Sequence, residues 1–233
     1  MSTAPEKNRA GRRTAERLLD AAERLVATAG PTVPLRQITQ AAGQKNNSAI
    51  TYHFGSRQGL IDAVWVRRTQ RVNRERAALL ERMDADGSID DLHALVEAHV
   101  LPFAHEMAEN LPSYWARFNE VALAQMPLSF LDTFDADLAR RVEQEVPMRT
   151  LSSVFQMMRK NVADGAEPAA GLRVALMVRF VITGLAGWER DHERGAVEAA
   201  SLPAYAQGLV ELGHGVLTQP SPALQEAAAR LLR

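Results

Sequence analysis

Apolar residues recur along almost the whole chain at spacings of three and four, the pattern of amphipathic helices, and no run alternates as a strand would. The pattern therefore predicts an all-α fold. Gly30-Pro31 ends the first helix, because proline cannot continue it, and Pro102 should kink or break the fifth. The expected helices cover residues 13–29, 35–42, 48–54, 57–83, 89–110, 112–125, 148–162 (with room for an earlier segment over 136–145), 170–190 and 202–217, and a short last helix lies within 220–233.

Residues 35–54 contain two short helices that meet at Gly43. Glycine most easily takes the positive φ that turns a chain sharply after a helix. The second helix ends near Phe54, and favourable N-cap residues precede it: Asn46, Asn47 and Ser48. Two short helices across a glycine-containing turn predict a helix-turn-helix, whose second helix enters the DNA major groove.

The formal net charge of −1 conceals two oppositely charged parts. Residues 1–76 hold 14 Lys and Arg against 6 Asp and Glu, whereas residues 77–233 hold 13 against 22. A basic segment that also contains a helix-turn-helix is expected to meet a polyanion. Within the helix over 57–83, a solvated face is expected to carry Arg67, Arg68, Arg71, Arg74 and Arg76.

Composition excludes several other classes of protein. The chain has no cysteine, so disulfides, thiolate metal sites and cysteine nucleophiles are excluded. Its start lacks the apolar segment of a secretory signal, and Arg173 and Arg179 interrupt its most apolar stretch, residues 172–188. We therefore expect a cytoplasmic protein without a membrane partner.

The chain is expected to divide into four parts. These are a flexible basic arm over 1–12, a helix-turn-helix domain over 13–56, a connecting helix over 57–83, and a ligand-binding and dimerisation domain over 84–233. The helix over 170–190 is apolar nearly all round, and the helix over 202–217 combines apolar residues with three glycines. Two such helices predict a two-fold interface in which each copy of the chain contributes the pair.

The N-terminal region resembles the TetR family of bacterial transcriptional regulators. Ala41-Ala42-Gly43 before the turn and Tyr52-His53-Phe54-Gly55-Ser56-Arg57 after it are similar to the signature of that family, and the match covers residues 13–66. The chain departs from the commonest form by one extra residue after Gly43 and by Thr51 in place of an aromatic residue. The resemblance implies a homodimer that binds a palindromic double-stranded DNA operator and is released by a small-molecule effector in the C-terminal domain.

The candidate DNA contacts divide into base-reading and phosphate-binding residues. By the usual pairings, Lys45 would read guanine, Asn46 or Asn47 adenine, and Thr51 a thymine methyl, with Gln44 as a further candidate. The longer turn leaves open which turn residue reaches a base, and at least one of Asn46, Asn47 and Ser48 is expected to be only a cap. For phosphate binding we expect Tyr52, His53 and Arg57, with support from Arg12, Arg13 and Arg36.

A small-molecule pocket is expected among the helices over 89–190, mostly apolar with a few orienting polar groups. The polar candidates are His99, Asn119 and Thr183, and the apolar ones are Phe103, Met107, Trp115, Phe118, Phe155, Met158 and Phe180. Core packing explains each of these residues equally well. We expect the effector to be largely apolar.

An enzyme is not expected, and no cofactor or metal is predicted. His93 with Glu97, and Glu189 with His192 or Glu193, have metal-ligand spacing but lack further ligands, and no nucleophile motif or phosphate loop is present. Two alternatives to a ligand-released repressor stay open. One is an activator or co-repressed regulator of the same family; the other is a helical ligand-binding protein or enzyme whose helix pair is incidental.

Overall fold

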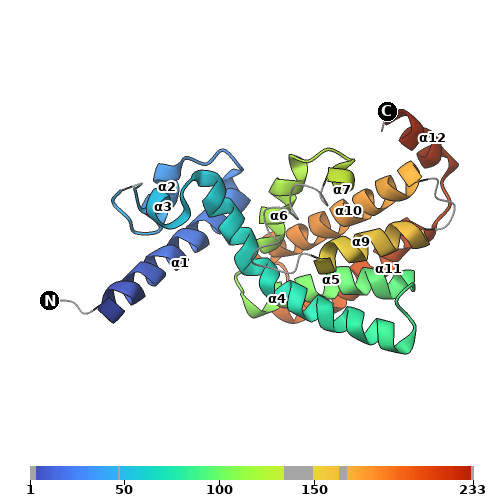
Figure 1. The fold of residues 1–233 in the computed structure, drawn as a ribbon, viewed down its shortest axis with the longest axis horizontal. Coiled ribbons are helices and arrows are strands. Elements are labelled where there is room, and N and C mark those ends of the chain that lie inside the picture. The colour runs from blue at the N-terminus through green and yellow to red at the C-terminus, as the bar shows by residue number, and fades with distance from the viewer. Residues whose placement is uncertain (1–3, 47, 134–148, 163–166, 232–233) are drawn as a thin grey trace. The chain divides into compact units, whose positions relative to one another are not determined.

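The computed structural model describes residues 4–46, 48–133, 149–162 and 167–231, which are helical with no strand (Figure 1). This confirms the all-α prediction for the described residues. The chain divides into two compact units, Met1–Arg68 and Thr69–Arg233. The α-helices are α1 (Ala4–Ala29), α2 (Leu35–Ala41), α3 (Ser48–Phe54), α4 (Arg57–Asp86), α5 (Leu92–Glu109), α6 (Trp115–Ala124), α7 (Phe130–Thr133), α9 (Arg149–Asn161), α10 (Glu167–Glu193), α11 (Leu202–Thr218) and α12 (Pro222–Leu231).

The predicted flexible arm is helical. Helix α1 begins at Ala4, so residues 4–12 form its first turns and not a separate segment. Pro5 suits the first turn of a helix, where its missing N–H is not needed, and the residues around it are mostly good helix formers. A single glycine at position 11 costs about 1 kcal/mol and does not end such a run. Another difference is α7, which was not predicted. The earlier segment predicted over 136–145 lies outside the described residues.

Unit 1 packs its helices around small and branched apolar side chains and one buried carboxylate. The apolar residues are Leu18, Ala22, Val26, Ile38, Ile50, Leu60 and Val64. Glu23, 2% exposed, accepts hydrogen bonds from Arg68 at 2.6–3.1 Å and from Arg67 at 2.9 Å, and Arg67 also pairs with Asp20. The prediction that Arg67 and Arg68 form a solvated face is therefore wrong, because both bind α4 to α1.

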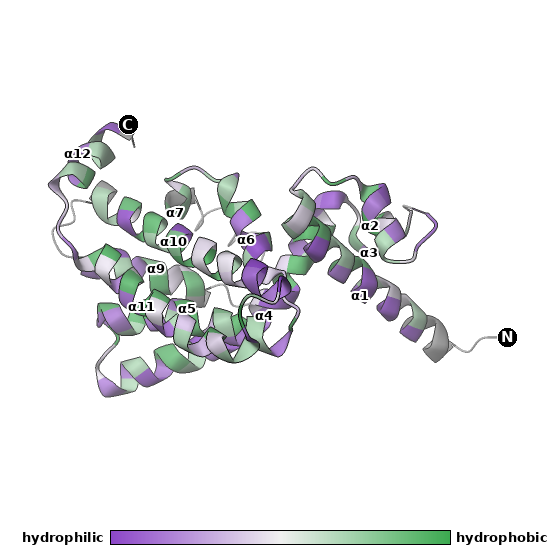
Figure 2. Cartoon of the chain, turned by 180° about the vertical axis from the view of Figure 1, so that it is seen from behind, coloured by the Kyte–Doolittle hydropathy of each residue, from purple (hydrophilic) through white to green (hydrophobic). Residues whose placement is uncertain are grey.

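In unit 2, α10 packs against α6 and α11, and α5 packs against α9 and α11. Figure 2 shows hydrophobic residues along each of these long helices. By length and composition, helix α10 could cross a membrane over Ala169–Glu193. However, 67% of its apolar stretch is buried inside the structure. Its Arg179 donates to the carbonyls of Leu123 and Met126 at 2.8 Å, and Arg173 donates to the carbonyl of Gln219. The polar residues of α10 thus satisfy the ends of neighbouring helices.

Helix α6 begins at a carboxylate from another helix. Glu189 of α10, 2% exposed, accepts hydrogen bonds from the backbone N–H groups of Ala116 and Arg117, both at 3.0 Å, and from the Ser113 hydroxyl at 2.7 Å. Free N–H groups at a helix N-terminus favour a negative charge. Burial nevertheless raises the pKa of the Glu189 carboxyl, and these hydrogen bonds with the nearby Arg117 oppose that rise.

Helix α5 continues through Pro102, so the helix does not break there as one form of the prediction had it. Proline leaves the carbonyl four residues earlier without its helical donor. That carbonyl belongs to Ala98, and it accepts a hydrogen bond from Arg76 Nε at 2.9 Å. A buried arginine from α4 therefore supplies the donor that Pro102 lacks.

The junction between α3 and α4 has no room for a side chain at Gly59. Ser56 caps α4, its hydroxyl accepting from the Gly59 N–H at 3.0 Å, and Gly55 takes a φ of +73°. A Cβ at residue 59 would lie 2.0 Å from the Phe54 carbonyl oxygen, which is main chain and cannot turn away. The glycine thus allows α4 to start directly against the end of α3.

Replacing Gly59 by alanine should destabilise unit 1 by about 2 kcal/mol, because the new methyl group must push apart two backbones. Urea unfolding followed by circular dichroism measures the change. Gln58→Ala, one residue earlier on the exposed side of α4, is the matched control and should stay within about 0.5 kcal/mol of the parent protein. Equal stabilities of the two variants would contradict the close approach.

Candidate functional site

The turn after α2 has the geometry of a glycine-ended helix. Gly43 takes a φ of +70°, its N–H donates to the Gln40 carbonyl at 3.0 Å, and the Gln44 N–H donates to the Thr39 carbonyl at 2.8 Å. This pair of hydrogen bonds is the Schellman motif. It confirms the predicted glycine turn and fixes the direction in which the chain leaves α2.

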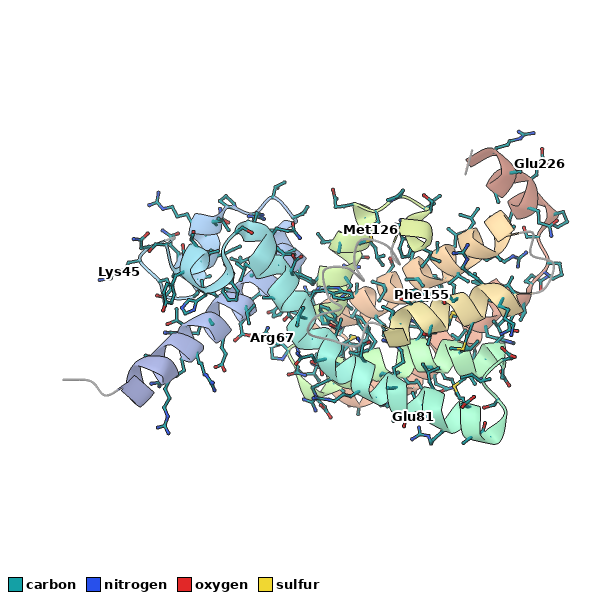
Figure 3. The ribbon with its side chains drawn as sticks, in the orientation of Figure 1. Lys45, Arg67, Glu81, Met126, Phe155 and Glu226 are labelled. Atoms are coloured by element: carbon teal, nitrogen blue, oxygen red, sulfur yellow. The ribbon has the colours of Figure 1, made fainter. Side chains whose placement is uncertain are left out.

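Helix α3 presents a polar face to solvent. Ile50 is buried in the core of unit 1, whereas Ser48, Thr51 and Tyr52 share the opposite, exposed face, and Tyr52 is 84% exposed. Lys45 lies on the turn ahead of the helix and is also exposed (Figure 3). A short helix with a buried apolar side and an exposed polar side can present several hydrogen-bonding groups to one groove of a duplex.

Asn46 lies just ahead of α3 and bonds to its first residue. Its Oδ1 accepts a hydrogen bond from the Ser48 N–H at 3.0 Å, which agrees with the expectation that at least one of the three candidates serves as a cap. Asn47 lies outside the described residues. Gln44 is half-buried, and its amide approaches the Ala42 carbonyl at 3.5 Å. Among the described turn residues, Lys45 is therefore the one least held by contacts within the chain.

Arg57 has a structural role that the sequence did not predict. Its guanidinium donates to the carbonyls of Val33 and Pro31, both at 2.5 Å, and so holds the loop between α1 and α2. Arg57 therefore has fewer N–H groups left to bind a phosphate. His53 is half-buried with its ring 4.9 Å from that of Tyr52, and a Cβ at Gly11 of α1 would lie 3.8 Å from its Cε1. The remaining basic candidates are exposed on helices α1 and α2: Arg12, Arg13 and Arg36.

In unit 2 the structure brings most of the predicted ligand residues into one buried aromatic group. The Phe103 and Trp115 rings stack with centroids 5.5 Å apart, Trp115 and Phe118 at 5.7 Å, and His99 lies 5.3 Å from Phe155. Met107 and Met158 are also fully buried. Helices α5, α6 and α9 supply these side chains.

Two predicted ligand residues do not join that group. Phe180, 38% exposed, and Thr183 instead lie on a solvent-facing side of α10. Helix α10 was taken as apolar nearly all round, which concealed that one of its faces is left uncovered in the single chain. Asn119 is half-buried, and its amide donates to the Trp115 carbonyl at 2.7 Å within α6.

Buried polar atoms without partners lie in the aromatic group. Both ring nitrogens of His99 and the Nε1 of Trp115 have no hydrogen-bond partner among the described residues. Leaving a buried polar group unpaired costs about 1–3 kcal/mol. Burial, with the positive charge of Arg76, lowers the pKa of His99 from 6.5 to about 3. The imidazole is therefore neutral at pH 7, with one N–H donor and one acceptor available.

Arg76 is the residue of this region that sequence reasoning missed. It was placed on a solvated face of α4, yet it is 2% exposed and donates to Ala98 and, at 2.6 Å, to Asn73 Oδ1. Burial lowers its pKa to about 10. The available signal was Pro102, because a proline inside a helix leaves a carbonyl that needs an outside donor.

An exposed apolar face runs along α10 and α11. Phe180 of α10 is joined by Tyr205, 41% exposed, and Leu212, 60% exposed, on α11. The Tyr205 hydroxyl donates to the Gly184 carbonyl at 3.2 Å, so the two helices are directly linked. A Cβ at Gly184 would lie 2.8 Å from Leu209, which shows how closely they pack. These are the two helices predicted to form a dimer interface.

Comparison with known proteins assigns no family. A scan against protein-family models finds no match, and a search of the curated proteins finds no similar protein. The resemblance of residues 13–66 to the TetR family therefore stays a prediction. Across the residues that the structure describes, no group of three His, Asp or Glu side chains is arranged to hold a metal ion, and His93 instead lies 3.9 Å from Glu97 and 3.6 Å from Glu211.

The buried His99 should make the stability of the protein depend on pH. Its folded-state pKa of about 3 lies below the value of 6.5 expected when unfolded, so only the unfolded chain takes up this proton as the pH falls. This term should lower the free energy of unfolding by about 2 kcal/mol between pH 6.5 and pH 5. His99→Leu should remove that part of the pH dependence in urea unfolding. Met107→Leu, a buried change without a titratable group, should retain it, and equal slopes for both variants would contradict the argument.

Proposed function

We propose that this protein is a homodimeric transcriptional repressor that binds a palindromic operator through α3 and is released by a small molecule held in unit 2. The observation that carries the proposal is the pair α2 and α3, joined at Gly43, with Lys45, Thr51 and Tyr52 exposed on one side. A helix-turn-helix of this form places its second helix in the major groove. The excess of positive charge over residues 1–76 supports a polyanionic partner.

A second copy of the chain is the proposed partner at the exposed apolar face of α10 and α11. Phe180, Tyr205 and Leu212 lie there among small residues, which favours close packing of helix pairs. Two-fold symmetry would give two copies of α3, matching two half-sites of a palindrome. Half-sites one helical turn apart require α3 helices spaced at about 34–36 Å, or at a multiple of it.

The base-reading role of α3 is testable on DNA taken from upstream of the protein's own gene. Lys45→Ala and Thr51→Ala should each weaken operator binding about tenfold or more, because a lost base contact costs about 1–3 kcal/mol. An electrophoretic mobility shift against competitor DNA of random sequence measures this. Arg82→Ala, an exposed arginine of α4 in unit 2, is the control and should bind as the parent does. Binding no tighter than to random DNA would favour a helical protein whose helix pair is incidental.

The dimer is testable by a charge placed in the apolar face. Leu212→Glu should convert the protein to a monomer in sedimentation velocity, because two glutamates would be buried near the two-fold axis without partners. Operator affinity should fall with it, since one α3 then binds one half-site. Met126→Glu changes another exposed apolar residue, 37% exposed and on neither α10 nor α11, and should leave the dimer intact. A parent protein that sediments as a monomer would contradict the proposal.

A further inference from the structure

Arg76 is a buried cation whose hydrogen bonds go only to neutral groups. Its guanidinium donates to the Ala98 carbonyl and to Asn73 Oδ1, and no carboxylate of the described residues forms an ion pair with it. The nearest charged influence on it is Glu75, its neighbour in sequence, whose carboxylate lies 2.6 Å from the His105 ring. Buried charges in proteins are ordinarily paired. With respect to the described residues, Arg76 therefore has no counter-ion and can bind an anion.

Two other buried side chains of unit 2 have polar atoms without a hydrogen-bond partner among the described residues. His99 follows Ala98 on α5, and the charge of Arg76 helps to lower its pKa. Neither of its ring nitrogens has a hydrogen-bond partner among the described residues. The indole N–H of Trp115, 1% exposed, is likewise unpaired and can only donate. A cationic ligand would be repelled by Arg76, and a neutral one would leave its charge without a counter-ion. An anionic group with several acceptor oxygens satisfies this set best.

The rest of the site is aromatic. Phe103 stacks on Trp115, and Phe155 packs beside His99, so flat apolar surfaces lie next to the donors. We infer that the effector of the proposed repressor is an apolar carboxylic acid, bound as its anion, with the carboxylate on Arg76 and His99 and the apolar part against Phe103, Trp115 and Phe155. This inference rests on the proposed function for the effect of the ligand on DNA, but the binding itself can be measured without DNA.

The structural role of Arg76 must be kept separate from its charge in any test. Arg76 donates a hydrogen bond to the carbonyl that Pro102 leaves free. Arg76→Ala would therefore destabilise α5 as well as remove the anion site. Arg76→Gln keeps an amide donor for Ala98 and removes the positive charge. Arg74→Gln, an exposed position on the same helix, is the matched control.

The experiment compares carboxylates with their neutral amides by isothermal titration calorimetry of the full chain at pH 7.5. The probes are indole-3-acetate against indole-3-acetamide and hexanoate against hexanamide, at concentrations up to millimolar. At least one carboxylate should bind about tenfold or more tightly than its amide. The preference should vanish in Arg76→Gln and persist in Arg74→Gln. His99→Phe removes the imidazole and leaves the guanidinium, and it should weaken binding of the same carboxylate. This variant provides the test if Arg76→Gln does not fold.

Three results would overturn the inference. They are amides that bind as tightly as carboxylates, a carboxylate preference that survives both Arg76→Gln and His99→Phe, and an absence of heat from all four probes. The fate of the proposed function is read separately from the mobility shift. A protein that binds its operator but prefers no carboxylate stays a regulator with another ligand, whereas one that prefers carboxylates but binds no operator is an acid-binding protein and not a repressor.

Discussion

An ionised side chain can be buried between helices only where a group of opposite charge or a set of hydrogen bonds meets it, and this requirement determines how the helices of this protein are held together. In unit 1 the carboxylate of Glu23 on α1 meets Arg67 and Arg68 of α4. In unit 2 the carboxylate of Glu189 on α10 meets the first N–H groups of α6. Each contact joins residues more than forty positions apart, so apolar packing brings the helices together and these contacts specify their register.

Arg76 differs from the buried charges of Glu23 and Glu189, because it has hydrogen bonds but no oppositely charged partner among the described residues. Its donors satisfy Ala98, the carbonyl freed by Pro102, but no anion neutralises it in the described structure. The hydrogen bond to Ala98 gives Arg76 a structural role, but a neutral donor could serve that carbonyl without burying a charge. The coincidence of this charge with the unpaired His99 and Trp115 is the feature that core packing alone does not explain.

Features that depend on neighbouring residues could be predicted from the sequence, whereas those that depend on distant partners could not. The turn at Gly43 was predicted because glycine acts on its own backbone within a few residues. Arg67, Arg68 and Arg76 were misassigned, and the backbone contacts of Arg57 were missed, because an arginine looks the same in sequence whether water or a buried acceptor receives its hydrogen bonds. Phe180 and Thr183 were placed in the interior because the periodicity of α10 does not reveal which of its apolar faces other helices cover.

Helix α4 is the element through which the proposed effector and the proposed DNA contact can influence each other. It runs without interruption from Arg57 to Asp86 and supplies residues to both compact units. Arg68, bound to Glu23 in unit 1, and Arg76, the proposed anion ligand in unit 2, are eight residues apart, about 12 Å along the helix. An anion that binds Arg76 more tightly in one position of α4 than in another shifts the population toward that position. A difference of about 1–3 kcal/mol is the usual size of such coupling, and one desolvated ion pair can supply it. The same linkage requires that operator DNA weaken carboxylate binding by the factor by which the carboxylate weakens operator binding.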